Sequence, residues 1–453
     1  MAHTRRIDMT QGPIIRSALL FALPIVLGNI LQQLYSTVDT LVVGNYCGSA
    51  SLAAVGTSSQ PIEVFLCLFM GMGNGISILT SQYTGSGDAA RRQLLAKNAV
   101  AFLYLCAVPL TVLGVICGPL LLRIMQVPPE AMDLAVSYVR ILFLGTLGNL
   151  GYNINAGILR GVGDSRPTLT FLLISCAVNI LLDLAFVVLL HMDVTGVALA
   201  TAIAMFVSWA ASAAYIRRRH PSLGMTFLPR CADKAVLREI VRMGFPLGLN
   251  SSLYSVGHFA MQVLVNGQGV IFAAACSVGG KVNSIANVAI QALASAATAF
   301  SGQNHGARRY DRLVQGAHRI PGFTGLITLA AGLTVTLFAR PIVSAFNDDP
   351  AVIDMAVRYV RVVLPFCSVY SVFTCIISFA NGMGLLKYST TVNLVVLWVV
   401  RIPVAFVISA FLDGTWVMAA IPISFVTGLV LMLLFFRTQR WRETRALARS
   451  MNG

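Results

Sequence analysis

The chain repeats one pattern of residues at an interval of 221 positions, and this repeat constrains its architecture more than any other feature. Pro129 and the run from Ala135 to Arg140 return as Pro350 and the run from Ala356 to Arg361. Further matches join Gly161 and Gly163 to Gly382 and Gly384, Gln82 to Gln303, and, one residue out of step, Pro24 to Pro246. Such a long series of matches predicts a duplicated fold.

The composition excludes a soluble domain. Hydrophobic residues make up 57% of the 453 residues and charged residues only 11%, whereas soluble domains carry roughly 25% charged residues. A surface this poor in charge belongs in a lipid bilayer. A duplicated membrane chain is typical of transporters whose two similar halves enclose a central path.

Twelve apolar segments are long enough to cross a bilayer, which requires about 20 helical residues. We expect spans at 17–43, 53–83, 96–117, 131–156, 168–190, 195–216, 239–265, 272–303, 318–338, 351–379, 388–411 and 415–436. Several exceed the minimum length, so tilted or bent helices are expected. The predicted fold is an all-α membrane protein with two parallel six-helix repeats.

In a soluble protein, the net charge of +15 would suggest a nucleic-acid ligand. Here the positions of the basic residues indicate that the surplus reflects the orientation of the chain in the membrane. Lys and Arg concentrate in the N-terminal segment, in alternate loops and in the tail, whereas the opposite loops hold only Arg123 and Arg340. By the positive-inside rule both termini are cytoplasmic. We therefore expect membrane lipids, and no nucleic acid, among the partners.

An even number of spans per repeat gives both halves the same orientation. The predicted division is an N-terminal bundle at 1–216, a cytoplasmic linker at 217–238, a C-terminal bundle at 239–436 and a basic tail at 437–453. The space between two such bundles is the natural path for a solute.

Acidic residues inside spans are costly and therefore point to function. Asp39, Glu63 and Asp183 all lie well inside spans of the first half, and no carboxylate lies at such a depth in the second half. There the basic residues that we single out are His258, Lys281 and Arg401. The two copies therefore share one plan but differ in chemistry.

Asp39, Asp183 and Thr201 each lie roughly 9–12 Å inside the outer end of their span, at about 1.5 Å per residue. Asn179 precedes Asp183 by one helical turn and shares its face. Two carboxylates, an amide and a hydroxyl at one depth predict a pocket for H⁺ or Na⁺. The alternative is that the carboxylates cap helix ends, a task that uncharged side chains perform equally well.

Glu63 follows Gln60 and Pro61 in the second span. It is a candidate for proton relay or for binding a cationic substrate, with Gln60 beside it. The alternative is a salt bridge from Glu63 to Lys281 or Arg401.

Arg401 lies near the middle of its span and should face a cavity or an acidic partner. His258 is a candidate proton carrier or a packed, hydrogen-bonded core residue. Pro24 and Pro61 interrupt spans one and two, so we expect hinges or static kinks there.

No catalytic constellation, nucleotide motif or metal-ligand cluster occurs, and the nine cysteines give no disulfide or zinc spacing. We therefore expect no enzyme activity and no cofactor, apart from Na⁺ where it serves as the coupling ion.

Several motifs resemble the multidrug and toxic compound extrusion (MATE) family. They are Val38–Gly44, Ser81–Gly85, Leu159–Pro167 and the Asn179-x-x-x-Asp183 pair. The resemblance implies twelve helices in two bundles with a V-shaped cleft, and a first-half cation site that matches Asp39, Asn179, Asp183 and Thr201.

The resemblance also implies export of drug-like organic compounds in exchange for H⁺ or Na⁺ by a monomer in the bacterial inner membrane. Two alternatives stay open. One is a lipid-linked oligosaccharide flippase of the same wider group, and the other is an uncoupled channel or receptor-like membrane protein.

Overall fold

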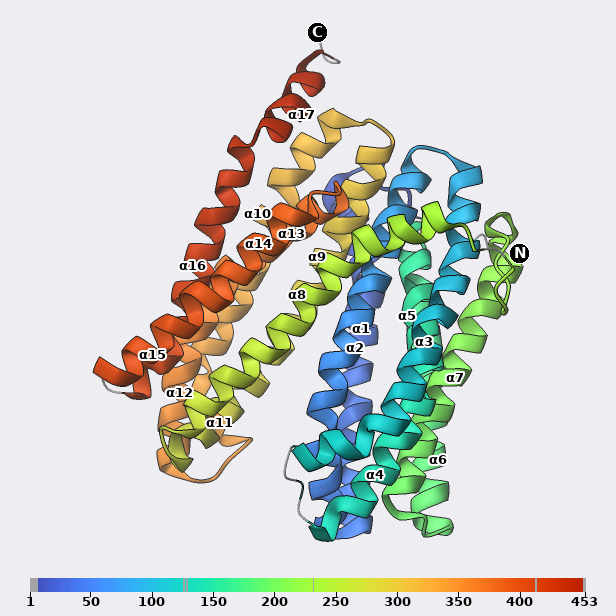
Figure 1. Ribbon diagram of the computed structural model, residues 1–453. Coiled ribbons are helices and arrows are strands. Elements are labelled where there is room, and N and C mark those ends of the chain that lie inside the picture. The colour runs from blue at the N-terminus through green and yellow to red at the C-terminus, as the bar shows by residue number, and fades with distance from the viewer. Residues whose placement is uncertain (1–6, 125–126, 128, 231, 412–413, 451–453) are drawn as a thin grey trace. The chain divides into compact units, whose positions relative to one another are not determined.

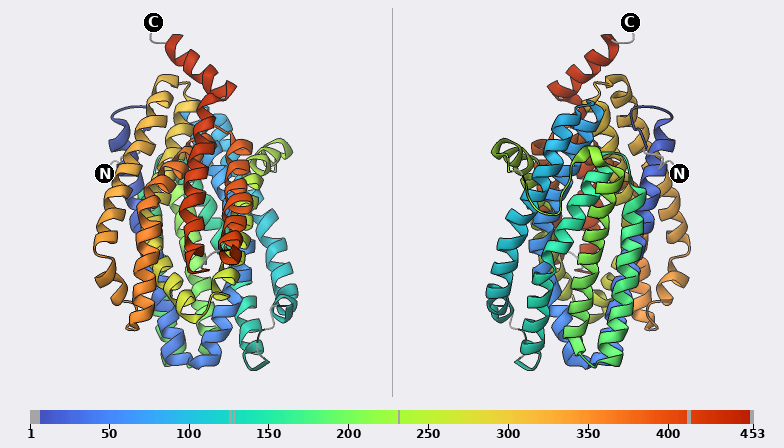
Figure 2. Two further views of the ribbon diagram at one scale, coloured as in Figure 1. Left: turned by 90° about the vertical axis from the view of Figure 1, so that its left-hand side faces the viewer. Right: turned by 90° about the vertical axis from the view of Figure 1, so that its right-hand side faces the viewer.

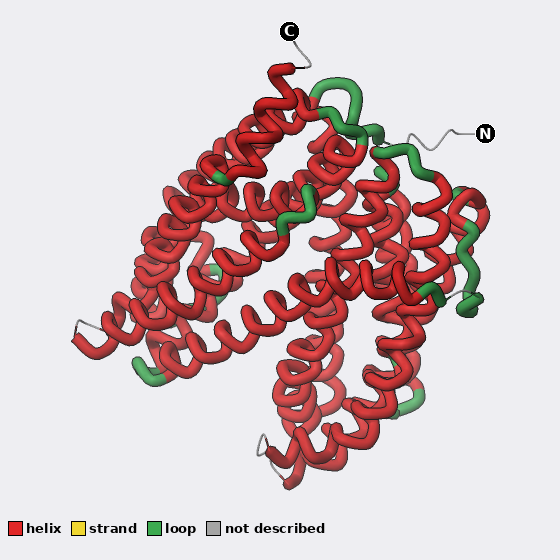
Figure 3. The backbone as a smooth tube through the Cα atoms, turned by 45° about the horizontal axis from the view of Figure 1, so that its top comes forward, coloured by secondary structure: helices red, strands yellow, loops and turns green. Residues whose placement is uncertain are grey.

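The computed structural model describes residues 7–124, 127, 129–230, 232–411 and 414–450. Within these ranges, the side chains of 40, 48–50, 52–54, 56–65, 124, 130, 414, 439 and 440 lie outside the description. The described chain is helical throughout, with short connections between helices (Figures 1 and 3).

The first copy of the repeat begins with three long helices and ends with four shorter ones. Their bounds are α1 Ile14–Val42, α2 Gly48–Gly85, α3 Ala89–Ile124, α4 Pro129–Leu144, α5 Thr146–Gly161, α6 Arg166–Asp183 and α7 Asp193–Arg219. A short 3₁₀ turn at Pro221–Leu223 follows α7. Helix α7 packs against both α5 and α6 (Figure 2).

The second copy follows the same plan with more interruptions. Its helices are α8 Lys234–Asn266, α9 Val270–Gly306, α10 Tyr310–Leu337, α11 Ala339–Ser344, α12 Pro350–Val363, α13 Cys367–Gly382, α14 Leu386–Leu394, α15 Ile402–Phe411, α16 Ala420–Leu433 and α17 Gln439–Ser450. Short 3₁₀ turns occur at Leu364–Phe366, Gly414–Ala419 and Leu434–Arg437.

Helices are the expected solution because lipid offers no hydrogen bonds, so each segment must satisfy its own backbone. Among the described residues, nine helices are long and apolar enough to cross a membrane, and one bent pair adds a tenth. The long helices α2 and α8 fall on the second and seventh expected spans.

The bent pair corresponds to the expected span at 131–156. Helices α4 and α5 meet at an angle of 42° on either side of Gly145. A Cβ atom at Gly145 would approach Ala202 of α7 to 3.0 Å. The close approach of α7 therefore occurs where the span bends.

Three helices contain π-helical turns, at Val43–Cys47, Leu184–Leu189 and Val395–Arg401. Such turns are rare and frequently occur at functional sites. The first two directly follow the helices that end after Asp39 and at Asp183, and the third ends at Arg401. Each therefore adjoins a predicted functional residue.

The described chain forms two compact units. Unit 1 contains residues 23–249, and unit 2 contains residues 7–22 and 250–453. Helices α1 and α8 each contribute residues to both units. In both helices a proline lies close to the division, Pro24 in α1 and Pro246 in α8.

Repeated residues make repeated contacts in the two units. Gly163 and Gly384 both adopt a left-handed backbone, with φ of 86° and 82°. In unit 1 the amide of Asp164 donates to the carbonyl of Leu159 at 2.8 Å, and in unit 2 Leu385 donates to Ala380 at 3.0 Å. These residues are separated by the interval of the repeat, so the duplication is structural.

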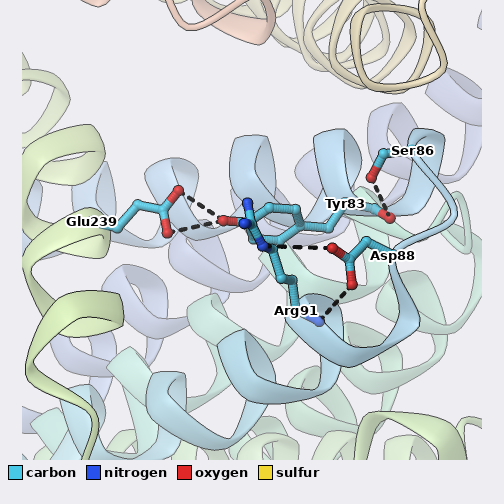
Figure 4. Close-up of polar contacts among 5 residues, drawn as sticks. All are labelled: Tyr83, Ser86, Asp88, Arg91 and Glu239. Atoms are coloured by element: carbon cyan, nitrogen blue, oxygen red, sulfur yellow. Dashed lines mark hydrogen bonds and ion pairs between the residues drawn. The ribbon is translucent and has the colours of Figure 1, made fainter.

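In both copies, residues at the end of the second long helix of the repeat (α2 or α9) form hydrogen bonds at or just before the start of another long helix. In unit 1 the Tyr83 hydroxyl donates to the Glu239 carboxylate of α8, at 2.8 and 2.9 Å from its two oxygens (Figure 4). In unit 2 Gln303 and Asn304 bind the backbone of Met9, which precedes α1, at 3.0 Å each. The same turn of the repeat thus anchors each of the two helices that are shared between the units.

Candidate functional site

Three of the four predicted cation-site residues come together between α6 and α7 in unit 1. Asn179 and Asp183 lie one turn apart on α6, and Thr201 lies on α7. The Asn179 amide nitrogen donates to the Thr201 hydroxyl at 3.4 Å. The side chains are 1%, 0% and 7% exposed, respectively. This is an enclosed polar cluster in a largely apolar bundle.

Asp39 of α1 joins this cluster. Its carboxyl group lies within direct interaction range of the Asp183 carboxyl. All four predicted residues therefore meet in unit 1, as the shared depth in the sequence predicts.

Four buried oxygen atoms of the cluster have no hydrogen-bond donor among the described residues. They are Oδ1 of Asp39, both carboxylate oxygens of Asp183 and Oδ1 of Asn179. An unsatisfied buried oxygen is costly, and two adjacent carboxylates repel each other unless a proton or a cation lies between them. The arrangement therefore suits a proton or a hard cation.

The donor set fits Na⁺ better than a transition metal. Carboxylate, amide and hydroxyl oxygens are the ligands that hard cations prefer. Among the described residues, no group of three or more His, Cys, Asp or Glu side chains is arranged to hold a metal ion. If Na⁺ is bound here, Asp39, Asp183, Asn179 and Thr201 would supply its oxygen ligands.

Two tyrosines belong to the cluster, and sequence reasoning did not identify them. The Tyr35 hydroxyl lies within hydrogen-bonding reach of Thr201, and Tyr35 also interacts with both carboxyl groups. Tyr138 of α4 lies close enough to interact with Asp39 and Asp183. Tyr35 precedes Asp39 by four residues and so shares its helix face, which is a signal that the sequence does contain.

Asp193, at the start of α7, forms a second polar contact in unit 1 that the sequence did not reveal. Its carboxylate accepts from the Ser51 hydroxyl at 2.8 Å and from the backbone amide of Val194 at 2.8 Å. Asp193 has a φ of 53°, a conformation that Asp tolerates better than most residues. The contact joins the start of α2 to the start of α7.

The predicted relay and cleft residues are not all placed in one site. The side chains of Gln60, Pro61 and Glu63 lie outside the described residues. His258 of α8 and Lys281 of α9 are exposed in unit 2. The proposed pairing of Glu63 with Lys281 or Arg401 therefore stays a prediction.

Arg401 is buried in unit 2 but pairs with none of the described carboxylates. Its guanidinium donates to the hydroxyls of Ser424 and Tyr254 at 2.8 and 3.2 Å. Among the described side chains its partners are thus neutral acceptors, and the expectation of a cavity or an acidic partner stays a prediction. Pro24 is buried within α1, next to the division between the units.

A duplicated bundle of long apolar helices with an enclosed carboxylate site defines a multispan membrane transporter. The MatE family model matches residues 24–185 and again 246–407, and the two matches begin at the repeated prolines. Together they cover more than half of the chain, so this protein belongs to the MATE family. It is accordingly a transporter and not an enzyme.

Similar proteins match over nearly the whole chain. The probable multidrug resistance protein YpnP of Bacillus subtilis is 26% identical over 97% of this chain and 98% of its own length. The probable multidrug resistance protein NorM of Thermotoga maritima is 25% identical over 97% and 96%. A crystal structure of MATE in the bent conformation is 22% identical, with a TM-score of 0.90 over 99% of both chains. The expected fold class is confirmed.

Proposed function

We propose that this protein is a secondary active exporter that moves drug-like organic compounds out of the cell in exchange for H⁺ or Na⁺. The observation that carries the proposal is the pair of carboxyl groups, Asp39 and Asp183, in which Oδ1 of Asp39 and both oxygens of Asp183 are buried with no donor among the described residues. Relatives named as multidrug resistance proteins support the substrate class.

The proposed cycle follows from the chemistry of the pair. A proton or Na⁺ that enters from outside neutralises the repulsion between Asp39 and Asp183 and allows their helices, α1 and α6, to close around it. Release of the cation to the cytoplasm restores the repulsion. The cation-bound site favours the conformation in which α1 and α6 are close, and the empty site favours the conformation in which they are apart. The cation gradient therefore drives the cycle between the two conformations.

The proposed setting is the bacterial inner membrane, with a monomer whose two termini are cytoplasmic. Basic residues in alternate loops support this orientation.

The experiment measures export of a fluorescent cationic dye from proteoliposomes under an imposed H⁺ or Na⁺ gradient, applied separately. We expect one gradient to drive transport, and Asp39→Asn and Asp183→Asn each to abolish it, because Asn keeps the shape but not the charge. Asp354→Asn is the matched control, since Asp354 is exposed and pairs with Arg340 at 3.2 Å.

Two results would contradict the proposal. One is full gradient-driven export by both Asn variants. The other is dye movement by the unchanged protein that ignores both gradients, which would indicate an uncoupled channel.

A further inference from the structure

Unit 2 contains a buried guanidinium that the cation site does not use. Arg401 ends the π-helical turn Val395–Arg401, between α14 and α15, and is only 8% exposed. A charged side chain in the interior of a membrane bundle is costly and usually functional.

The described neighbours satisfy only part of this side chain. Nε donates to Ser424 Oγ at 2.8 Å, and Nη1 donates to the Tyr254 hydroxyl at 3.2 Å. A guanidinium carries five N–H donors. Three of them therefore have no acceptor among the described residues.

Two aromatic rings lie next to the same group. The guanidinium carbon of Arg401 lies 5.3 Å from the ring centre of Phe425 on α16 and 5.9 Å from that of Tyr254 on α8. Tyr370 of α13 packs against Phe425, with 4.6 Å between ring centres. Cation–π contacts stabilise a buried cation only partly.

No counter-charge is provided by the described side chains. The ion pairs Arg91–Asp88, His220–Asp164 and Arg340–Asp354, all between described side chains, do not include Arg401. A guanidinium that meets no carboxylate among the described side chains, and has donors to spare, is complementary to an anion.

The repeat strengthens this interpretation. At the interval of 221 residues, Arg401 corresponds to Ile180, next to Asn179 on α6. The same element of the repeat therefore carries a carboxylate site in unit 1 and a guanidinium in unit 2. Both lie beside a π-helical turn, at Leu184–Leu189 and Val395–Arg401.

We propose that unit 2 holds an anion-binding site, centred on Arg401, for the carboxylate of an aromatic organic compound. The planar fork of the guanidinium matches the two oxygens of a carboxylate. The rings of Tyr254 and Phe425 beside the guanidinium favour an aromatic body over a small inorganic anion. The identification of this compound as a transported substrate rests on the proposed function, whereas its binding does not.

A pair of dyes that differ only in the carboxylate tests the proposal. Rhodamine 110 has a free benzoate, and rhodamine 123 is its methyl ester. Binding to the purified full-length protein is measured by fluorescence polarisation. We expect the unchanged protein to prefer the free acid, and Arg401→Gln to weaken binding of the free acid roughly tenfold or more while the ester changes little.

Two further variants make the assay specific. Arg401→Lys keeps the charge but loses the planar fork, so it should retain part of the preference and should fold where Arg401→Gln does not. Arg358→Gln is the matched control, because the exposed guanidinium of Arg358 also lies over an aromatic ring, Trp416, at 5.7 Å. It should leave the affinity for both dyes unchanged.

The overturning results are distinct. Equal affinity of the unchanged protein for the two dyes, failure to bind the free acid, or equal losses for both dyes in Arg401→Gln and Arg401→Lys would each refute the site. Displacement of rhodamine 110 by chloride or phosphate as effectively as by benzoate would refute its preference for aromatic carboxylates. Failure of the proposed export function would instead show only in the gradient assay.

Discussion

We expect the carboxyl oxygens of Asp39 and Asp183 to determine what unit 1 binds. Their polar neighbours among the described residues include Asn179, Thr201, Tyr35 and Tyr138. Thr201 accepts from Asn179 and also lies within reach of the Tyr35 hydroxyl. Tyr35 is therefore placed to orient Thr201 toward a bound cation.

Tyr35→Phe tests this positioning role. The variant removes one hydroxyl and keeps the ring, so we expect about 1 kcal/mol of lost cation binding, or roughly a fivefold higher cation concentration for half-maximal transport. The maximal rate at saturating cation should change little. Tyr46→Phe is the control, because Tyr46 is 61% exposed. Identical cation dependence in the two variants would remove Tyr35 from the site.

At the residue scale the sequence identified the charged members of the cluster together with Asn179 and Thr201, but not the two tyrosines beside them. Asp39 and Asp183 stand out because an acidic residue in an apolar span is rare. Tyr35 and Tyr138 do not, because a tyrosine in a membrane helix is ordinary packing material as often as a ligand. The aromatic partners of Arg401 were missed for the same reason.

Within each unit, neighbouring helices pack closely at glycines that the repeat shares. Gly161 lies against Thr80, and its counterpart Gly382 lies against Ser301, at the same interval of the repeat. A Cβ atom at these glycines would come within 2.5 Å and 2.0 Å of those side chains, respectively. The repeated glycines therefore set the distance between neighbouring helices.

Gly382→Ala should destabilise the protein by about 1–3 kcal/mol, because the new methyl group also meets the Thr298 carbonyl at 2.4 Å. Gly280→Ala is the matched control, since a Cβ atom there meets nothing within 4 Å. The control should be neutral or stabilise α9 by up to about 1 kcal/mol through helix propensity. Thermal unfolding in detergent measures both, and equal midpoints for the two variants would contradict the packing argument.

The shared helices α1 and α8 are the elements in which we expect bending during transport. Each passes from one unit to the other close to a proline that removes a backbone hydrogen bond. The sequence predicts a hinge at Pro24. Its repeat partner Pro246 likewise lies close to the point at which α8 passes from unit 1 to unit 2.

Pro24→Ala and Pro246→Ala should each lower the transport rate several-fold while maintaining stability, because an unbroken helix resists bending. Pro109→Ala is the control, since Pro109 interrupts α3 entirely within unit 1. Initial rates of dye export at a fixed gradient distinguish them. Unchanged rates in both hinge variants, or an equal loss in the control, would locate the bending elsewhere.

At the scale of the whole molecule, the sequence predicts those features of the fold that a lipid environment requires. Long apolar segments must be helices, so the spans and the duplication could be read from the chain. The bend between α4 and α5 could not, because it occurs at Gly145, in an apolar run without proline, where α7 approaches. The start of α1 belongs to unit 2 and the start of α8 belongs to unit 1. This could not be predicted either, because it depends on contacts between residues distant in sequence, such as Tyr83 with Glu239.

The orientation of the molecule is a prediction from charge alone, and single cysteines test it. All described cysteines are free, so they can be replaced without breaking a disulfide. In that background we expect Gly267→Cys, in the exposed connection between α8 and α9, to react with a membrane-impermeant maleimide in intact cells. Ser222→Cys, exposed in the basic linker after α7, should react only once the membrane is permeabilised. The opposite pattern would invert the topology, and with it the side from which the coupling cation reaches Asp39 and Asp183.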